Sequence, residues 1–221
     1  MKDDYTHIAI ILDRSGSMKQ IKDDTIGGFN QFLEDQQKEE GYATVTLAQF
    51  DSSYELLEDF TDIGEVPLLT EETFIPRSMT ALQDAIGLTV NSVGQKLAAL
   101  DEKDRPSKVL ICVMTDGDEN ASREFSPSDI KELVKLQTEE YKWEFVFIGA
   151  NQDAVITSGT LGFDAGKTMT YAANSRGTTS AYQTLSDNVK TLRNSKGADT
   201  SEAMLFSDDQ KKEQKDAGAV A

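Results

Sequence analysis

Apolar and polar residues follow one another in blocks that predict alternating strands and helices along most of this chain. The first block, His7–Leu12, is almost continuously apolar, and such a run predicts a strand covered on both faces, as in a parallel sheet. Further strands are predicted at 44–50, 54–60, 108–114, 143–148 and 168–171. Helical spacing predicts helices at 18–37, 81–100, 127–141 and 175–194, and a short one ending near 159.

One of the predicted strands should run against the others. Only Asp51-Ser52-Ser53 separates 44–50 from 54–60, which is too short for the crossover that parallel strands need. These two strands should therefore form a hairpin, in an α/β sheet of about six mostly parallel strands. The segment 61–79 that follows has no periodicity, and a loop of this length is unusual unless it is functional.

The composition fits one large acidic domain. The 221 residues include 39 acids against 22 Lys and Arg, and the net charge of −17 argues against a nucleic-acid or anionic membrane surface. The single cysteine, Cys112, lies in an apolar run and should be a core residue; with Met1–Asp4 leading directly into a strand, it favours a cytoplasmic location. We predict a domain over 1–195 and a polar C-terminal tail over 196–221, whose docking on the domain the sequence leaves open.

Oxygen-bearing side chains follow two of the buried strands. Asp13, Ser15 and Ser17 come after the first strand, Asp116 follows a later one, and Thr80 stands where the second long helix begins. If the first and fourth strands are neighbours, these residues share one crevice at the carboxyl edge of the sheet. Oxygen-only ligands suit a hard cation, so the sequence predicts a site for Mg²⁺, with Mn²⁺ and Ca²⁺ as alternatives.

Two of these residues have a structural alternative. Ser17 with Gln20, and Thr80 with Gln83, have the spacing of capping boxes at helix N-termini. A serine can cap a helix and also face a metal, so both roles stay open.

Taken together, the three motifs resemble a known site. Asp-Xaa-Ser-Gly-Ser after an apolar strand, Thr80 in Ser-Met-Thr-Ala-Leu and Asp116 in Met-Thr-Asp-Gly resemble the metal-ion-dependent adhesion site of von Willebrand factor A domains. The resemblance spans roughly residues 4–195 and implies a Rossmann-like, three-layer α/β/α fold. It points to small stand-alone bacterial and phage members, which commonly act with a protein partner, sometimes an AAA+ ATPase or a metal-chelatase-like assembly.

The charges of the site predict what it does. Two carboxylates neutralise a divalent ion on paper and three hydroxyls add no charge, so the metal can accept a carboxylate from outside as its last ligand. This predicts a module that binds an acidic residue of a partner protein, and not an enzyme. The rim around the site is expected to carry Arg14, Arg77, Asp118, Glu119 and Glu124.

Two other functions stay open. A metal-dependent phosphohydrolase of the HAD type also places a nucleophilic Asp after its first strand, and Asp116 with Asp118 could mimic its second acid pair; however, it needs an acid where Ser15 stands and a lysine that has no obvious candidate here. The same fold without a metal would be a scaffold. The turn after Asp13 lacks the Gly-rich spacing and the lysine of a nucleotide-binding loop, and the only histidine, His7, opens a strand.

Overall fold

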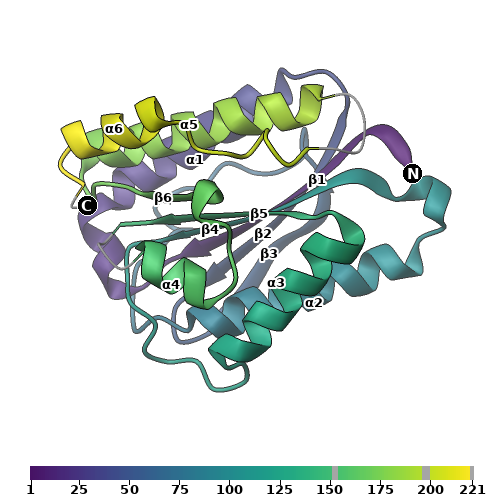
Figure 1. The fold of residues 1–221 in the computed structure, drawn as a ribbon. Coiled ribbons are helices and arrows are strands. Elements are labelled where there is room, and N and C mark those ends of the chain that lie inside the picture. The colour runs from purple at the N-terminus through teal and green to yellow at the C-terminus, as the bar shows by residue number, and fades with distance from the viewer. Residues whose placement is uncertain (151–153, 196–199, 220–221) are drawn as a thin grey trace.

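The computed structural model describes residues 1–150, 154–195 and 200–219 and arranges them as one six-stranded sheet between two layers of helices (Figure 1). The strand order is β3-β2-β1-β4-β5-β6, so β1 and β4 are neighbours at the centre. Neighbouring strands pair in parallel except β2 with β3, which confirms the predicted hairpin and sheet. The strands are β1 (Lys2–Asp13), β2 (Tyr42–Phe50), β3 (Tyr54–Asp62), β4 (Pro106–Thr115), β5 (Glu144–Gly149) and β6 (Thr168–Thr170).

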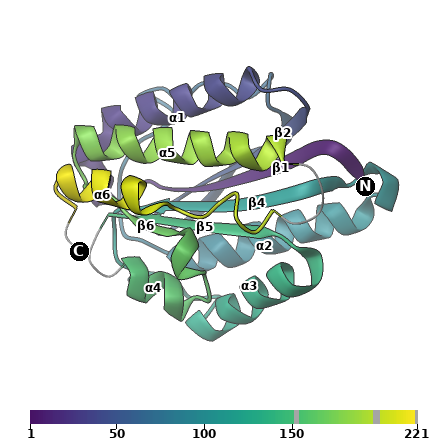
Figure 2. The same cartoon turned by 45° about the horizontal axis from the view of Figure 1, so that its top comes forward.

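The helices cover the two faces of the sheet as separate layers. One layer contains α1, α5 and α6, and the other contains α2, α3 and α4; the view in Figure 2 shows α1 and α5 running side by side. The helices are α1 (Lys22–Gln37), α2 (Leu82–Ala99), α3 (Pro127–Tyr141), α4 (Ala154–Thr160), α5 (Ser175–Asn194) and α6 (Asp208–Asp216).

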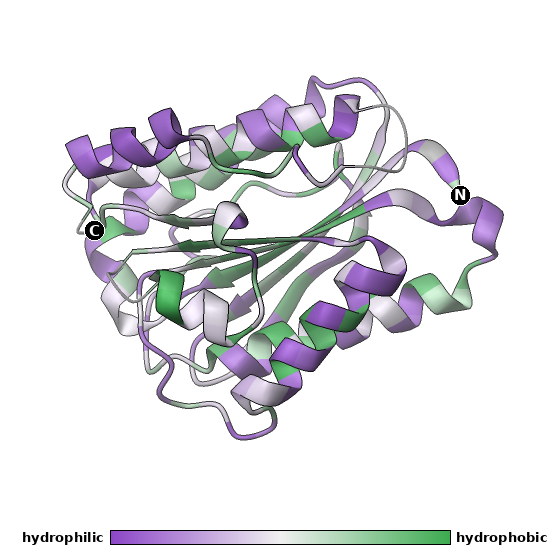
Figure 3. Ribbon diagram, viewed as in Figure 1, coloured by the Kyte–Doolittle hydropathy of each residue, from purple (hydrophilic) through white to green (hydrophobic). Residues whose placement is uncertain are grey.

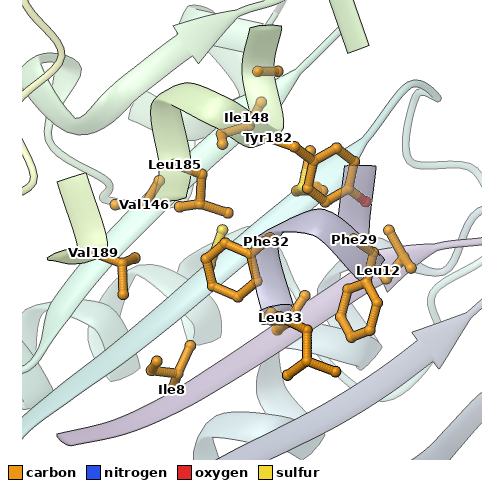
Figure 4. Close-up of a cluster of buried hydrophobic side chains, with 14 of the residues drawn as sticks. Ile8, Leu12, Phe29, Phe32, Leu33, Val146, Ile148, Tyr182, Leu185 and Val189 are labelled. Atoms are coloured by element: carbon orange, nitrogen blue, oxygen red, sulfur yellow. The ribbon is translucent and has the colours of Figure 1, made fainter. Parts of the chain in front are cut away.

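Strand β1 shows why both layers are needed. Ile8 and Leu12 pack in the cluster beneath α1 and α5, whereas Ala9 and Ile11 pack in the opposite cluster with α2 and α3. In Figure 3 the strands are apolar and the outer helix surfaces are polar, and Figure 4 shows the first cluster from the side of α1 and α5. Cys112 is fully buried in this cluster, as predicted.

Close packing of α1 against α5 depends on one glycine. A Cβ added at Gly28 would lie 2.3 Å from the Tyr182 ring, whereas one added at Gly27 would meet nothing within 4 Å. Gly28 therefore permits the close approach of α1 to α5, whereas Gly27 is not needed for it.

The first helix differs from its prediction. Gly16–Ile21 form a 3₁₀ helix before α1, so Ser17 lies inside a helical turn and makes no capping hydrogen bond. The N-cap of α2 is Ala81, again without a side-chain cap. The capping-box alternatives for Ser17 and Thr80 are thus not realised, whereas the capping box of α3, Ser126 with Asp129, is present.

Two segments that carry little sequence signal also pack on the domain. The long loop after β3 buries Ile63, Leu69 and Phe74 in the cluster beneath α1, which anchors it on its way back across the domain. In the C-terminal segment, Met204 and Phe206 are buried in the same cluster, and α6 lies against α5. The described part of the predicted tail, 200–219, therefore docks on the domain. No helix in the described ranges combines the length and apolar character needed to cross a membrane.

Candidate metal centre

The predicted site residues lie at the carboxyl ends of the two central strands. Asp13 is the last residue of β1, and Asp116 directly follows β4. Ser15 and Ser17 lie in the turn after β1, and Thr80 lies just before α2. Asp13, Ser15 and Thr80 are buried, Asp116 is half-buried and Ser17 is exposed, so the group opens to solvent on the side of Ser17.

Four of the five side chains meet at one place. The Ser15 and Ser17 hydroxyl oxygens are 3.0 Å apart, and the Ser17 hydroxyl donates to Asp116 Oδ1 at 2.6 Å. Gly117 marks the point on which the hydroxyls converge. A Cβ built there would lie 2.9 Å from Thr80 Oγ1, 3.3 Å from Ser15 Oγ and 3.4 Å from Ser17 Oγ, a space that any larger residue would fill.

Asp13 borders this group and is fixed by two protein donors. The backbone N–H of Ser15 donates to Asp13 Oδ1 at 2.6 Å, and the Thr115 hydroxyl donates to Asp13 Oδ2 at 2.5 Å. Each oxygen of this buried carboxylate therefore already accepts one hydrogen bond. Asp13 is oriented by β1 and β4 together, because Thr115 is the last residue of β4.

Both carboxylates carry negative charge at an energetic cost. Burial raises the pKa of Asp13 to about 6, against the hydrogen bonds from Thr115 and Ser15, and the nearby Asp116 charge raises it further. Burial likewise raises the pKa of Asp116, opposed by its hydrogen bond from Ser17. Burial raises the pKa of Tyr171, after β6, well above its usual range, and the charges of Asp116, Tyr182 and Asp13 raise it further.

This donor set fits a hard divalent cation. It consists of carboxylate and hydroxyl oxygens, which such cations prefer. In the described part of the chain, neither Asp13 nor Asp116 forms an ion pair with a basic side chain; the nearby arginines pair with Asp51 and Glu55 instead. A cation would offset the negative charges of these two carboxylates, whose pKa values are raised by burial. No group of three or more His, Cys, Asp or Glu in the described residues could hold a metal, so a site here depends on the hydroxyls.

Two of the predicted rim residues have other roles. Arg14 is only 5% exposed, because its guanidinium turns inward to Asp51 at 3.2 Å and Glu55 at 2.5 Å. The Glu119 carboxylate accepts from the backbone N–H groups of Gln83 and Ser122, and so joins its own loop to α2. Neither side chain lies free at the surface: Arg14 is held in buried contacts, and Glu119 is held by backbone groups.

The other rim residues do lie at the surface. The Arg77 side chain is 55% exposed while its Nε donates to Asp51 Oδ2 at 2.9 Å. Asp118 and Glu124 are exposed on the loop after β4. Met79, directly before Thr80, is 51% exposed and was not predicted.

Three residues that shape the site were not predicted from the sequence. Thr115 orients Asp13, Gly117 leaves the space among the hydroxyls, and Asn120 binds the backbone of Thr80. Thr115 and Gly117 flank Asp116 in the Met-Thr-Asp-Gly motif, so their position next to a predicted ligand could have identified them. Asn120 had only a weak signal, as one polar residue in a polar loop.

Comparison with known proteins bears on the fold. Neither a sequence-family model nor a curated protein matches the chain, but solved structures do. They include proximal thread matrix protein 1 from the mussel byssus with a zinc-occupied MIDAS motif (12% identity, TM-score 0.58, 82% of this chain and 47% of that one). A second match is a von Willebrand factor type A protein from Catenulispora acidiphila (11% identity, TM-score 0.57, 84% of this chain and 43% of that one). A third is BatB from Bacteroides thetaiotaomicron (13% identity, TM-score 0.56, 86% of this chain and 100% of that one).

These matches show which fold the chain has. Its mostly parallel sheet between helices is the Rossmann-like fold of von Willebrand factor A domains. The chain spans less than half the length of the mussel and Catenulispora chains. At identities of 11–13%, the matches show a shared fold and no more.

Proposed function

We propose that this chain is a divalent-cation-dependent protein-binding module. Asp13, Ser15, Ser17, Thr80 and Asp116 would hold one Mg²⁺, and an Asp or Glu of a partner protein would complete the coordination shell. The observation that carries the proposal is the convergence of three hydroxyls on the space beside Gly117, next to two carboxylates that form no ion pair with any basic residue the structure describes. The zinc-occupied motif of the mussel protein supports a cation in a domain of this fold.

The five residues would divide the work according to their surroundings. Ser15, Ser17 and Thr80 offer neutral oxygens that keep the ion electrophilic, and Asp116 offers a charged oxygen on the solvent side. Asp13, whose two oxygens each accept a protein hydrogen bond, would supply charge from beneath and hold ordered water. When bound, the ion would supply a Lewis-acidic position open to a carboxylate.

The same contacts favour binding over catalysis. A phosphatase of the HAD type would use Asp13 as its nucleophile and would have a second acid where Ser15 stands. Ser15 offers a hydroxyl and a backbone N–H to Asp13 but no carboxyl group for acid–base work. We therefore expect the purified protein with Mg²⁺ to show no phosphate-ester turnover; turnover that is lost in Asp13→Asn would favour the enzyme instead.

The rim suggests from which side a partner approaches. Arg77 and the apolar Met79 lie exposed on the loop before α2, whereas Asp118 and Glu124 are exposed on the loop after β4. An incoming carboxylate is repelled by the second loop and attracted by the first. The partner's acidic segment would therefore cross the loop that carries Arg77 and Met79. An AAA+ ATPase or related assembly is one candidate partner, and a cytoplasmic location remains our expectation.

Affinity capture from a lysate tests the proposal. The tagged protein is used with Mg²⁺ and with EDTA, and Asp116→Ala is the matched variant. We expect one set of partners that both EDTA and the variant remove. Partners that survive both treatments would mean that binding uses another face and that any metal here is structural.

A further inference from the structure

Hydrogen bonds with Asn120 and Ala121, together called the clasp, hold the backbone of Thr80 beside the other candidate ligands. We infer that Asn120 is a positioning residue of the metal centre, which fixes Thr80 so that its hydroxyl meets those of Ser15 and Ser17. This inference rests on the function proposed above, and it concerns a residue that would not itself contact the ion.

Asn120 binds Thr80 at both of its backbone polar groups. The side-chain Oδ1 of Asn120 accepts the Thr80 N–H at 2.9 Å, and the Asn120 N–H donates to the Thr80 carbonyl at 3.0 Å. The N–H of Ala121 donates to the same carbonyl at 3.1 Å. With both groups held, the peptide planes on either side of Thr80 are fixed, and so is the direction of its side chain.

The clasp joins two of the segments that supply candidate ligands. Asn120 lies four residues after Asp116 on the loop after β4, so its bonds tie the Thr80 segment to the Asp116 segment. The same loop supplies acceptors to the first turn of α2. Glu119 Oε2 accepts the Gln83 N–H at 3.0 Å, and Ser122 Oγ accepts the Asp84 N–H at 3.1 Å. These acceptors replace the local capping box that the sequence suggested.

The neighbours of Thr80 are held from other directions. Ser78 O accepts from Gly16 N–H at 3.1 Å, and the Ala81 N–H donates to Asp51 O at 2.8 Å. Loss of the Asn120 side chain would leave these bonds in place, so the loop should stay folded while Thr80 gains freedom. Because Mg²⁺ demands near-ideal octahedral geometry, a small loss of order at one ligand weakens binding.

The chain contains a matched control in α2, which binds the same loop. Asp84 accepts the backbone N–H groups of Arg123, Glu124 and Phe125 at 2.8–2.9 Å, at the far end of the loop from Thr80. Asp84→Ala should loosen the loop without releasing Thr80. Asn120→Asp keeps an acceptor oxygen for the Thr80 N–H and serves as the conservative rescue.

The first readout needs no metal. Amide hydrogen exchange, followed by NMR in EDTA, should show the Thr80 N–H protected in wild type, Asn120→Asp and Asp84→Ala, and exposed in Asn120→Ala. Equal protection in Asn120→Ala would overturn the inference, because the side-chain bond would then not hold Thr80.

The second readout is Mg²⁺ affinity by calorimetry. We expect Asn120→Ala to lose about 10–100-fold, and Asp84→Ala and Asn120→Asp to stay within about threefold of wild type or above it. Equal losses in Asn120→Ala and Asp84→Ala would indicate a general stabilising role and overturn the inference. If Asn120→Ala does not fold, Asn120→Gln, which displaces the amide by one methylene, should show the same loss. A wild type that binds no Mg²⁺ would instead contradict the proposed function, and the exchange experiment would still decide whether Asn120 holds Thr80.

Discussion

Two groups of acidic side chains lie beside one another at the carboxyl edge of the sheet, and they differ in how their charge is balanced. Asp51, at the tip of the β2–β3 hairpin, receives N–H groups from two guanidinium ions, Arg14 at 3.2 Å and Arg77 at 2.9 Å. Among the described residues, the hydrogen-bond donors to Asp13 and Asp116 are backbone and hydroxyl groups, which carry no charge.

The contrast shows where the fold has left negative charge available. Arg14 follows Asp13 in the sequence, yet its guanidinium turns to Asp51 and Glu55, and no other basic side chain in the described ranges forms an ion pair with Asp13. The first group is a closed ion-pair cluster that joins the hairpin to the loop before α2. The second group is open and electrically unbalanced, which is the state that a cation site needs before the cation arrives.

Removal of Asp51 should give the largest effect. Asp51→Ala leaves the buried Arg14 with Glu55 and Gln49 as its remaining acceptors, and breaking a buried ion pair costs about 3–5 kcal/mol. We expect a loss of about 3 kcal/mol in the free energy of unfolding. Urea denaturation in EDTA measures this loss. A loss below about 1 kcal/mol would show that the ion pairs of Asp51 contribute little to stability, and that the two acidic groups do not differ in how strongly their charge is balanced.

Gly117→Ala should affect the open group almost exclusively. The added methyl would lie 2.9 Å from Thr80 Oγ1, in the space where the hydroxyls converge, so we expect Mg²⁺ affinity to fall at least about 100-fold with little change in stability. Gly27→Ala is the control, because its Cβ meets nothing and should leave metal binding intact. Undiminished Mg²⁺ binding by Gly117→Ala would place any metal elsewhere.

Asp13→Asn should act in the opposite direction to Asp51→Ala. In the folded protein the pKa of Asp13 is raised to about 6 from 3.8, so above pH 6 the ionised form costs stability, and this cost disappears as the pH falls through 6. Without metal at pH 8, Asp13→Asn should therefore raise the free energy of unfolding, by at most about 3 kcal/mol. The gain should shrink between pH 6 and pH 4. Chemical denaturation of the wild type and the variant at pH 8 and at pH 4 checks this, and a variant less stable than the wild type at pH 8 would contradict it.

Arg77→Glu should give the smallest effect, because this side chain bridges the closed group and solvent. Exposed ion pairs contribute about 0.2–1 kcal/mol, so we expect a modest loss of stability and a few-fold weaker binding of any EDTA-sensitive partner. Surface plasmon resonance should show the change mainly in the association rate. Complete loss of partner binding would mean that Arg77 is a central contact.

The fold could be predicted further than the surroundings of the site. A continuous apolar strand and a three-residue hairpin turn are local signals, and they indicated that β1 is covered on both faces and that β3 runs antiparallel. The position of Arg14 depends on Asp51 and Glu55, which lie 37 and 41 residues away in the sequence, so no local pattern could assign it to the interior.

The same limit explains the capping predictions. Thr80 and Gln83 have the spacing of a capping box, but Glu119, 36 residues from Gln83, supplies the acceptor instead. In the C-terminal segment, burial of Met204 and Phe206 between polar stretches depends on an apolar cluster that only the folded domain provides. Oxygen-bearing residues at strand ends could thus be found from sequence, whereas the partners that orient them could not.

The most direct test of the open, cation-binding group is a Mg²⁺ titration of the wild type and of the double variant Ser15→Ala with Ser17→Ala, followed by calorimetry and by thermal unfolding. Ser17 makes no capping bond, so the double variant should fold, and removal of two of the converging hydroxyls should abolish binding. We predict saturable binding of one Mg²⁺ and a Mg²⁺-dependent rise in Tm for the wild type alone. Equal Mg²⁺ binding by both proteins, or none by the wild type, would contradict the account.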